Sequence, residues 1–197
     1  MKFYGNKSGL GLIEVIVALA VVITGVVSGL TLTSYNLNAS VASQTRLIAA
    51  NLAREGLEVV RSLRDSNWLA GNPWNSNIVA ADKYRLIVQF DPSANAWSTV
   101  SQDTDLAACD ACQIYLDEAN DVYGHDDTKT LTGYRRLLTK RDICWPTGVT
   151  EALLAEGEVC GDYGYPLAGW QLESEVSWTE QRQIRTISVI DKIYDWH

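Results

Sequence analysis

The longest apolar segment of the chain lies close to its start. From Leu10 to Leu32 the sequence contains a single formal charge, Glu14. A helix of this length rises about 1.5 Å per residue and is about 35 Å long, which is enough to cross the hydrocarbon core of a bilayer. No second apolar run of comparable length follows. The pattern therefore predicts one membrane-spanning helix, residues 10–32.

After Leu32 the sequence becomes more polar but keeps a helical period, and proline is absent until Pro73. Apolar or small side chains recur about every 3.6 residues. The positions of this stripe are Val41, Thr45, Ile48, Leu52, Gly56, Val59 and Leu63. We expect one continuous helix of about 55 residues, from Leu10 to about Asp65, whose amphipathic half (residues 33–65) packs on a sheet.

From residue 66 the pattern changes to short strands between turn signals. The expected strands are Tyr84–Phe90, Gln113–Leu116, a short one around Val122 and Tyr123, Tyr134–Lys140, Leu172–Trp178 and Gln183–Ile190. The last two alternate between apolar and polar positions and should form a hairpin closed by Thr179–Arg182. An antiparallel sheet in a globular head (residues 66–197), packed on the long N-terminal helix, is an α+β fold.

A short polar leader, residues 1–9, precedes the apolar run. Its Lys2 and Lys7 should stay in the cytoplasm under the positive-inside tendency, which places the head outside. The leader is not an ordinary secretory signal, because its small residue Gly9 lies before the apolar segment and not after it. Cleavage after Gly9 would leave the hydrophobic helix attached and would create a new amine at Leu10.

Glu14 is unusual inside an apolar run. An unpaired carboxylate in the bilayer costs about 3 kcal/mol on insertion scales. Two arrangements relieve this cost: the carboxylate lies at the membrane interface, or it pairs with the cationic amine that cleavage creates at Leu10. These two groups lie four residues apart within one helix, and they can also meet between two parallel, staggered helices.

The segment Ser8–Leu19 (SGLGLIEVIVAL) resembles the class III prepilin signal of type IV pilins and type II secretion pseudopilins. The resemblance implies that a membrane peptidase cuts between Gly9 and Leu10, that Leu10 is then N-methylated, and that Glu14 guides subunit docking. Leucine at the cleaved position and the lack of proline in the apolar run favour a minor over a major subunit. Asn51–Trp68 and the hairpin Val176–Ile187 also resemble PilV-type minor pilins.

The resemblance implies a structural subunit of a type IV pilus-like or pseudopilus filament. It would reside in the inner membrane before assembly, as a single-pass protein with its head outside, and afterwards in a cell-surface pilus or a periplasmic pseudopilus. Its partners would be prepilin peptidase, an inner-membrane assembly platform and other pilin subunits. The alternative from another class is a single-pass, membrane-anchored extracellular binding module that recognises a glycan or a protein.

Two further features of the helix bear on assembly. Gly25 and Gly29 form a small-xxx-small pair, which permits tight helix packing or marks a point of unwinding, since each interior glycine costs up to about 1 kcal/mol relative to alanine. The resemblance favours unwinding, because helices of this family are stretched near this depth in assembled filaments. Four arginines lie opposite the apolar stripe and face either solvent or acidic surfaces of neighbouring subunits: Arg46, Arg54, Arg61 and Arg64.

The chain has four cysteines, all in the part expected outside the cell: Cys109, Cys112, Cys144 and Cys160. An even count in an extracytoplasmic domain indicates disulfides, for which three connectivities are possible. We expect Cys144–Cys160, which would contribute about 3 kcal/mol in the chain-entropy model, and Cys109–Cys112 as a local clip. A zinc site is disfavoured because the chain has no second pair of cysteines close in sequence and no histidine near them. A thioredoxin-like role is disfavoured because no parallel sheet is expected.

Charge and composition exclude other classes of function. The net charge is −8, and residues 66–197 alone carry about −10, so a nucleic acid would be repelled. With two histidines and no phosphate-binding loop, no catalytic constellation is apparent, and we expect neither an enzyme nor a cofactor or metal. The acid-rich stretch 117–127 is expected to be a solvated turn, because Ala119 and Tyr123 occupy positions at which an EF-hand needs calcium ligands.

Seven tryptophans are many for this length. Trp178 lies in an alternating strand and should be in the core. Five others lie near turn signals and could cap the edges of the core or bind a sugar or protein: Trp68, Trp74, Trp97, Trp145 and Trp170.

Overall fold

The computed structural model describes residues 11–80, 83–146 and 150–195. The chain consists of a long helix, α1 (Leu12–Leu69), followed by an antiparallel sheet, which confirms the α+β class. It divides into two compact units between Thr45 and Arg46, and α1 contributes to both. Gly9 and Leu10, the predicted cleavage and methylation positions, lie outside the described residues.

Helix α1 ends four residues later than the sequence analysis placed its end. Gly71 has a φ of 73°, its N–H donates to the carbonyl of Trp68 (3.0 Å), and the N–H of Asn72 donates to that of Asn67 (2.9 Å). These two bonds are the Schellman motif, which satisfies the last carbonyls of a helix and favours glycine in the left-handed conformation. Gly71 followed by Pro73 was therefore the stop signal, not the polar residues near Asp65.

The first unit is helical from Leu12 to its end at Thr45, and its apolar side chains are exposed. It contains a window long and apolar enough to cross a membrane, judged by length and composition. Val41 is 63% exposed, so the predicted stripe is wrong at this position. The buried face of α1 begins at Ala49, in the second unit.

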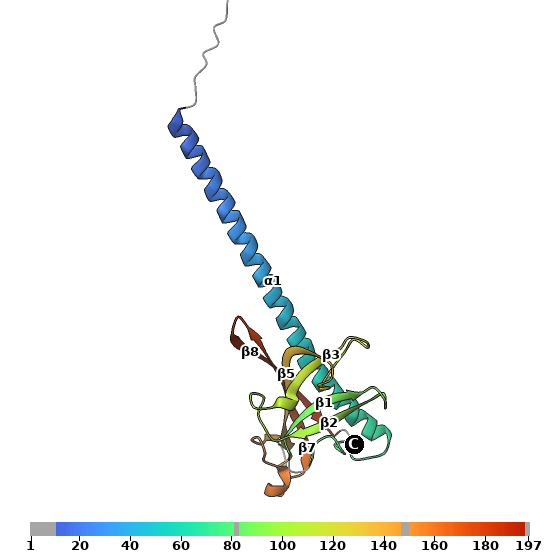
Figure 1. Cartoon of the computed structure of the whole chain (residues 1–197). Coiled ribbons are helices and arrows are strands. Elements are labelled where there is room, and N and C mark those ends of the chain that lie inside the picture. The colour runs from blue at the N-terminus through green and yellow to red at the C-terminus, as the bar shows by residue number, and fades with distance from the viewer. Residues whose placement is uncertain (1–10, 81–82, 147–149, 196–197) are drawn as a thin grey trace, which may run out of the picture. The chain divides into compact units, whose positions relative to one another are not determined.

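The second unit contains an eight-stranded sheet built around one long strand, β5 (Thr130–Cys144) (Figure 1). One edge of β5 pairs with β7 (Leu167–Glu180), which pairs with β8 (Gln183–Tyr194). The other edge pairs in turn with β3 (Gln113–Asp117), β1 (Arg85–Asp91) and β6 (Ala152–Leu153). The strand β2 (Ala96–Gln102) pairs with β1, and β4 (Val122–Gly124) with β3. Two 3₁₀ turns complete the unit: η1 (Asp110–Cys112) and η2 (Cys160–Tyr163).

The strands agree with the predicted set except in extent and number. The turn between β7 and β8 consists of Gln181 and Arg182 alone, both with positive φ (49° and 65°), as in the two-residue hairpin turns that match the twist of the strands. The predicted four-residue turn Thr179–Arg182 is therefore too long. Strands β2 and β6 were not predicted, because β2 is rich in Ser, Thr and Gln and β6 has two residues.

The second half of α1 packs on the sheet at very close range. Leu52, Ala53, Leu57 and Val60 are buried in the interface. A Cβ atom added to Gly56 would lie only 3.1 Å from both Leu138 Cδ1 and Ser174 Oγ. The small residue in the predicted stripe is thus the point at which helix and sheet approach most tightly, consistent with the expectation that this stripe covers a sheet.

Three of the tryptophans are core residues. Trp178 is buried, as predicted. Trp74 and Trp170, which lie near turn signals, are also buried, and their ring centroids are 4.6 Å apart. Among the other tryptophans, Trp68 and Trp97 are half-buried and Trp145 is 48% exposed. Among the residues that the structure describes, a tryptophan-based binding surface therefore has few rings available.

Candidate functional site

The apolar first part of α1 is the most conspicuous surface of the described chain. Leu12 and Ile13 are more than three-quarters exposed, and the apolar residues that follow are exposed on every side of the helix. Such a helix is stable only in an apolar surrounding, which a bilayer or other helices can supply. The surface is thus suited to insertion or to lateral helix packing.

Glu14 lies in the first turn of this helix. The helix begins with the N–H groups of Glu14 and Val15 bound to the carbonyl of Gly11. Carboxylates are favoured at this end, where the unpaired N–H groups give the helix a partial positive charge. Glu14 itself is exposed, so its carboxylate is available to a group on another molecule.

The segment around Gly25 and Gly29 is continuous helix, and apart from chain neighbours and the helix's own backbone nothing lies within 4 Å of the place where either Cβ would lie. Four hydroxyl groups here donate to carbonyls of their own helix at distances between 2.7 and 2.9 Å, from Thr24, Ser28, Thr31 and Thr33. These bonds satisfy the hydroxyl donors within the helix, so the side chains can lie in an apolar surrounding.

Two of the four helix arginines have partners within the second unit. Arg61 bonds to Glu58 and to Asp191 of β8, and Arg64 pairs with Asp65 and lies over the ring of Trp68. Arg46 and Arg54 are exposed. Arg46 and Arg54 are therefore more available than Arg61 and Arg64 for contact with another molecule.

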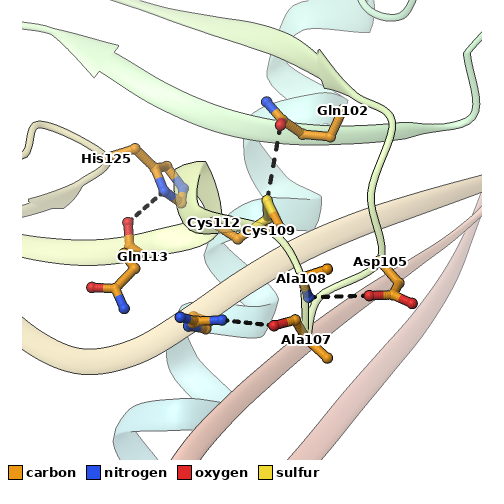
Figure 2. Close-up of a disulfide and its surroundings, with 9 residues drawn as sticks. Gln102, Asp105, Ala107, Ala108, Cys109, Cys112, Gln113 and His125 are labelled. Atoms are coloured by element: carbon orange, nitrogen blue, oxygen red, sulfur yellow. Dashed lines mark hydrogen bonds between the residues drawn. A yellow bond between two sulfur atoms is a disulfide. The ribbon is translucent and has the colours of Figure 1, made fainter.

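The structure joins Cys109 to Cys112 and Cys144 to Cys160, which is the pairing expected from the sequence. The first disulfide spans η1 and lies under β2, where Gln102 Oε1 is 3.8 Å from Cys109 Sγ (Figure 2). Both cysteines are buried in a small cluster with Ile87 and Leu137. Because an attacking thiolate has little access there, this disulfide is suited to holding the loop in place and not to thiol exchange.

The second disulfide lies beside a buried ion pair. Lys140 Nζ is 2.8 Å from Asp142 Oδ1 and 5.0 Å from the ring of Trp170. The other carboxylate oxygen, Asp142 Oδ2, accepts a hydrogen bond from the N–H of Cys160 (3.3 Å). The charge of Asp142 is thus compensated, and it links the end of β5 to the turn η2.

Arg136 is a fully buried cation between α1 and the sheet. It donates to the carbonyls of Leu52 (3.0 Å) and Val88 (3.2 Å), and its Nη1 is 3.4 Å from Glu55 Oε1. Burial lowers the pKa of the Arg136 guanidinium, and the charge of Glu55 opposes this shift. Arg135 and Arg136 point to opposite faces of the same predicted strand, but nothing in the sequence indicated a charged side chain in the core.

The acid-rich stretch 117–127 borders a cavity of about 260 Å³ between β1 and the β3–β4 hairpin. His125 lies at this cavity, and its Nδ1 donates to the carbonyl of Gln113 (2.7 Å) (Figure 2). Burial, and then the charge of Arg136, lower the pKa of His125 to about 4, so the ring is neutral at neutral pH. In the part of the chain that the structure describes, no three His, Cys, Asp or Glu side chains are placed to hold a metal ion.

Comparisons with models of known protein families, with curated proteins and with solved structures find no match to this chain.

Proposed function

We propose that the protein is a structural subunit, a minor pilin, of a type IV pilus-like or pseudopilus filament. The observation that supports this most is the single helix α1: its first part is apolar and exposed on all sides with one carboxylate, Glu14, in the first turn, and its last part is packed on a sheet. A helix of this kind can stay in a bilayer before assembly and pack against copies of itself afterwards.

The physical driving force lies in packing and charge compensation. Moving an apolar helix from lipid to a bundle of like helices gains little from the hydrophobic effect, because lipid tails are as apolar as leucine. Close packing and paired polar groups must then decide the equilibrium. Glu14 supplies such a group: once the chain is cut after Gly9, the amine of Leu10 on a neighbouring subunit can neutralise it and remove a cost of about 3 kcal/mol.

This function assigns the remaining roles. Prepilin peptidase would cut between Gly9 and Leu10, and the subunit would wait in the inner membrane with its disulfide-bonded head outside. An assembly platform would then bring it to other pilin subunits. The two disulfides fit an oxidising compartment for the head, since such bonds are rare in the cytosol.

Mass spectrometry of the protein from its native cells tests the proposal. We expect the mature chain to begin at a methylated Leu10, both in membranes and in sheared filaments. A chain that retains Met1 and never appears in filaments would contradict the proposal and favour the membrane-anchored binding module instead. A Gly9→Arg variant is the matched control, because blocking cleavage should keep the leader and prevent incorporation while leaving the head folded.

A further inference from the structure

A cavity of about 260 Å³ opens on the second unit at the end of β1. Its apolar wall is made by Phe90 of β1, by Pro92 just after β1, and by Tyr115 and Val122 of the β3–β4 hairpin. Pockets for drug-sized ligands measure about 300–1,000 Å³, so this one suits a single small group. All of these residues belong to one compact unit.

Three carboxylates line the same cavity: Asp91, Asp117 and Asp126. Asp91 Oδ1 accepts from the N–H groups of Ser93 (2.9 Å) and Ala94 (3.3 Å), and Asp126 Oδ1 accepts from the N–H of Thr128 (3.0 Å). In the described ranges, Oδ2 of Asp91 and Oδ2 of Asp126 take part in none of these bonds. Each of these two side chains therefore offers one oxygen to a ligand.

The charges of the cavity wall do not cancel. Lys129 Nζ is 3.2 Å from Asp117 Oδ2 and compensates that carboxylate. His125 is neutral at neutral pH because its pKa is lowered to about 4, chiefly by burial. Hydrogen bonds lower the pKa of Asp91 and of Asp126, in each case chiefly the bond from a nearby hydroxyl, so both stay ionised. Two negative charges remain, next to aromatic rings.

We propose that this cavity binds a primary ammonium group, carried by an amino sugar or by a lysine side chain. Carboxylates and aromatic rings are the two kinds of group that attract such a cation, and here Asp91 and Asp126 lie in one cavity with Phe90 and Tyr115. Asp91 and Asp126 are exposed to solvent, and a neutral sugar would gain no charge–charge attraction from them. The proposal does not depend on the filament role, because the cavity lies wholly in the second unit.

Titration of the isotope-labelled full chain in detergent micelles, followed by NMR, tests the proposal. Glucosamine and glucose form one matched pair of probes, and acetyl-lysine amide and acetyl-norleucine amide form the other. We expect the amide signals of residues such as Gly124 to move with a cationic probe and not with its neutral partner. The cationic probe that binds more tightly identifies the source of the ammonium group. Equal binding of glucose and glucosamine, or binding of neither cationic probe, would overturn the proposal.

Two conservative variants keep the test separate from folding. Asp91→Asn and Asp126→Asn retain the Oδ1 acceptor of each turn but remove the charge, and each should weaken cation binding about fivefold. Asp105→Asn is the matched control: its Oδ1 also accepts a backbone N–H, from Ala108 (3.1 Å), and it lies outside this cavity. Unchanged affinity in both cavity variants, or an equal loss in the control, would argue against the site.

Discussion

The tight contact at Gly56 leads to a prediction whose sign is decided by packing. Replacing glycine by alanine inside a helix favours folding by about 1 kcal/mol through helix propensity. At Gly56, however, the added methyl group would lie 3.1 Å from Leu138 Cδ1 and from Ser174 Oγ, and 3.4 Å from Arg136 Cδ. All three of these side chains are buried and have little room to move. Overpacking of this kind costs about 1–3 kcal/mol, so we expect Gly56→Ala to destabilise the head by about 1 kcal/mol net.

Ser174 provides the test of this reasoning. Its Oγ is buried and has no hydrogen-bond partner within the described residues, so Ser174→Ala should be neutral or should stabilise by about 1 kcal/mol. Removing that oxygen also gives the methyl group introduced by Gly56→Ala room on one of its two tight sides. The double variant should therefore be more stable than the sum of the two single effects, with a coupling of about 1 kcal/mol.

Urea unfolding of the full chain in detergent micelles, followed by tryptophan fluorescence with the disulfides intact, measures these differences. Gly25→Ala is the control, because apart from its chain neighbours and the helix's own backbone nothing lies within 4 Å of its Cβ position, and because it belongs to the other unit. It should leave the unfolding of the head unchanged. A Gly56→Ala variant that gains the full helix-propensity energy, or two effects that simply add, would refute the packing argument.

Three further predictions concern assembly, cross-links and pH. Glu14→Ala should reduce incorporation into filaments on the order of 100-fold, because about 3 kcal/mol of charge compensation is lost. Thr24→Ala is the control: its hydroxyl bonds within its own helix, so this variant should assemble normally. Quantitative blots of sheared filaments measure both. Cys144→Ser with Cys160→Ser should lower the free energy of unfolding in urea by about 3 kcal/mol, and a loss near zero would rule out the loop-entropy account. The pKa of His125 is about 4 in the folded chain and about 6.5 when unfolded, so the unfolded chain binds a proton first as the pH falls. The head should therefore lose up to about 3 kcal/mol of stability between pH 6.5 and pH 4. Urea titrations at several pH values should show this loss, and His125→Asn should abolish it.

The periodicity of the sequence was sufficient to predict the long helix and most of the strands. A single apolar run and an amphipathic stripe predicted the long helix, and the alternation from Leu172 to Ile190 predicted the β7–β8 hairpin. The missed strand β2 has few apolar residues, and only its pairing with β1 makes it a strand. Its edge is further fixed by Thr99 Oγ1, which donates to the carbonyl of Ile78. Such long-range pairing leaves little trace in a local pattern.

The buried charged side chains could not be predicted from the sequence. Arg136 and Lys140 read as ordinary alternating positions of a half-buried strand, yet both are buried. What distinguishes them is their partners, Glu55 on the helix and Asp142 on the same strand. The cavity near Phe90 is likewise built from segments more than twenty residues apart, so no short sequence motif predicts it.

The arrangement of these buried groups bears on how a filament subunit could work. In the filament role proposed above, the first unit would leave lipid during assembly, and the second unit would have to keep its part of α1 on the sheet under any force on the helix. The helix is held there by apolar contacts from Ala49 to Val60 and by Arg136, which binds a carbonyl of α1 and a carbonyl of β1 at once. Removing one partner of a buried charge is strongly destabilising, because the other is left uncompensated. Arg136 thus makes separation of helix from sheet costly, and in the proposed filament role this would favour transmission of force from α1 to the sheet.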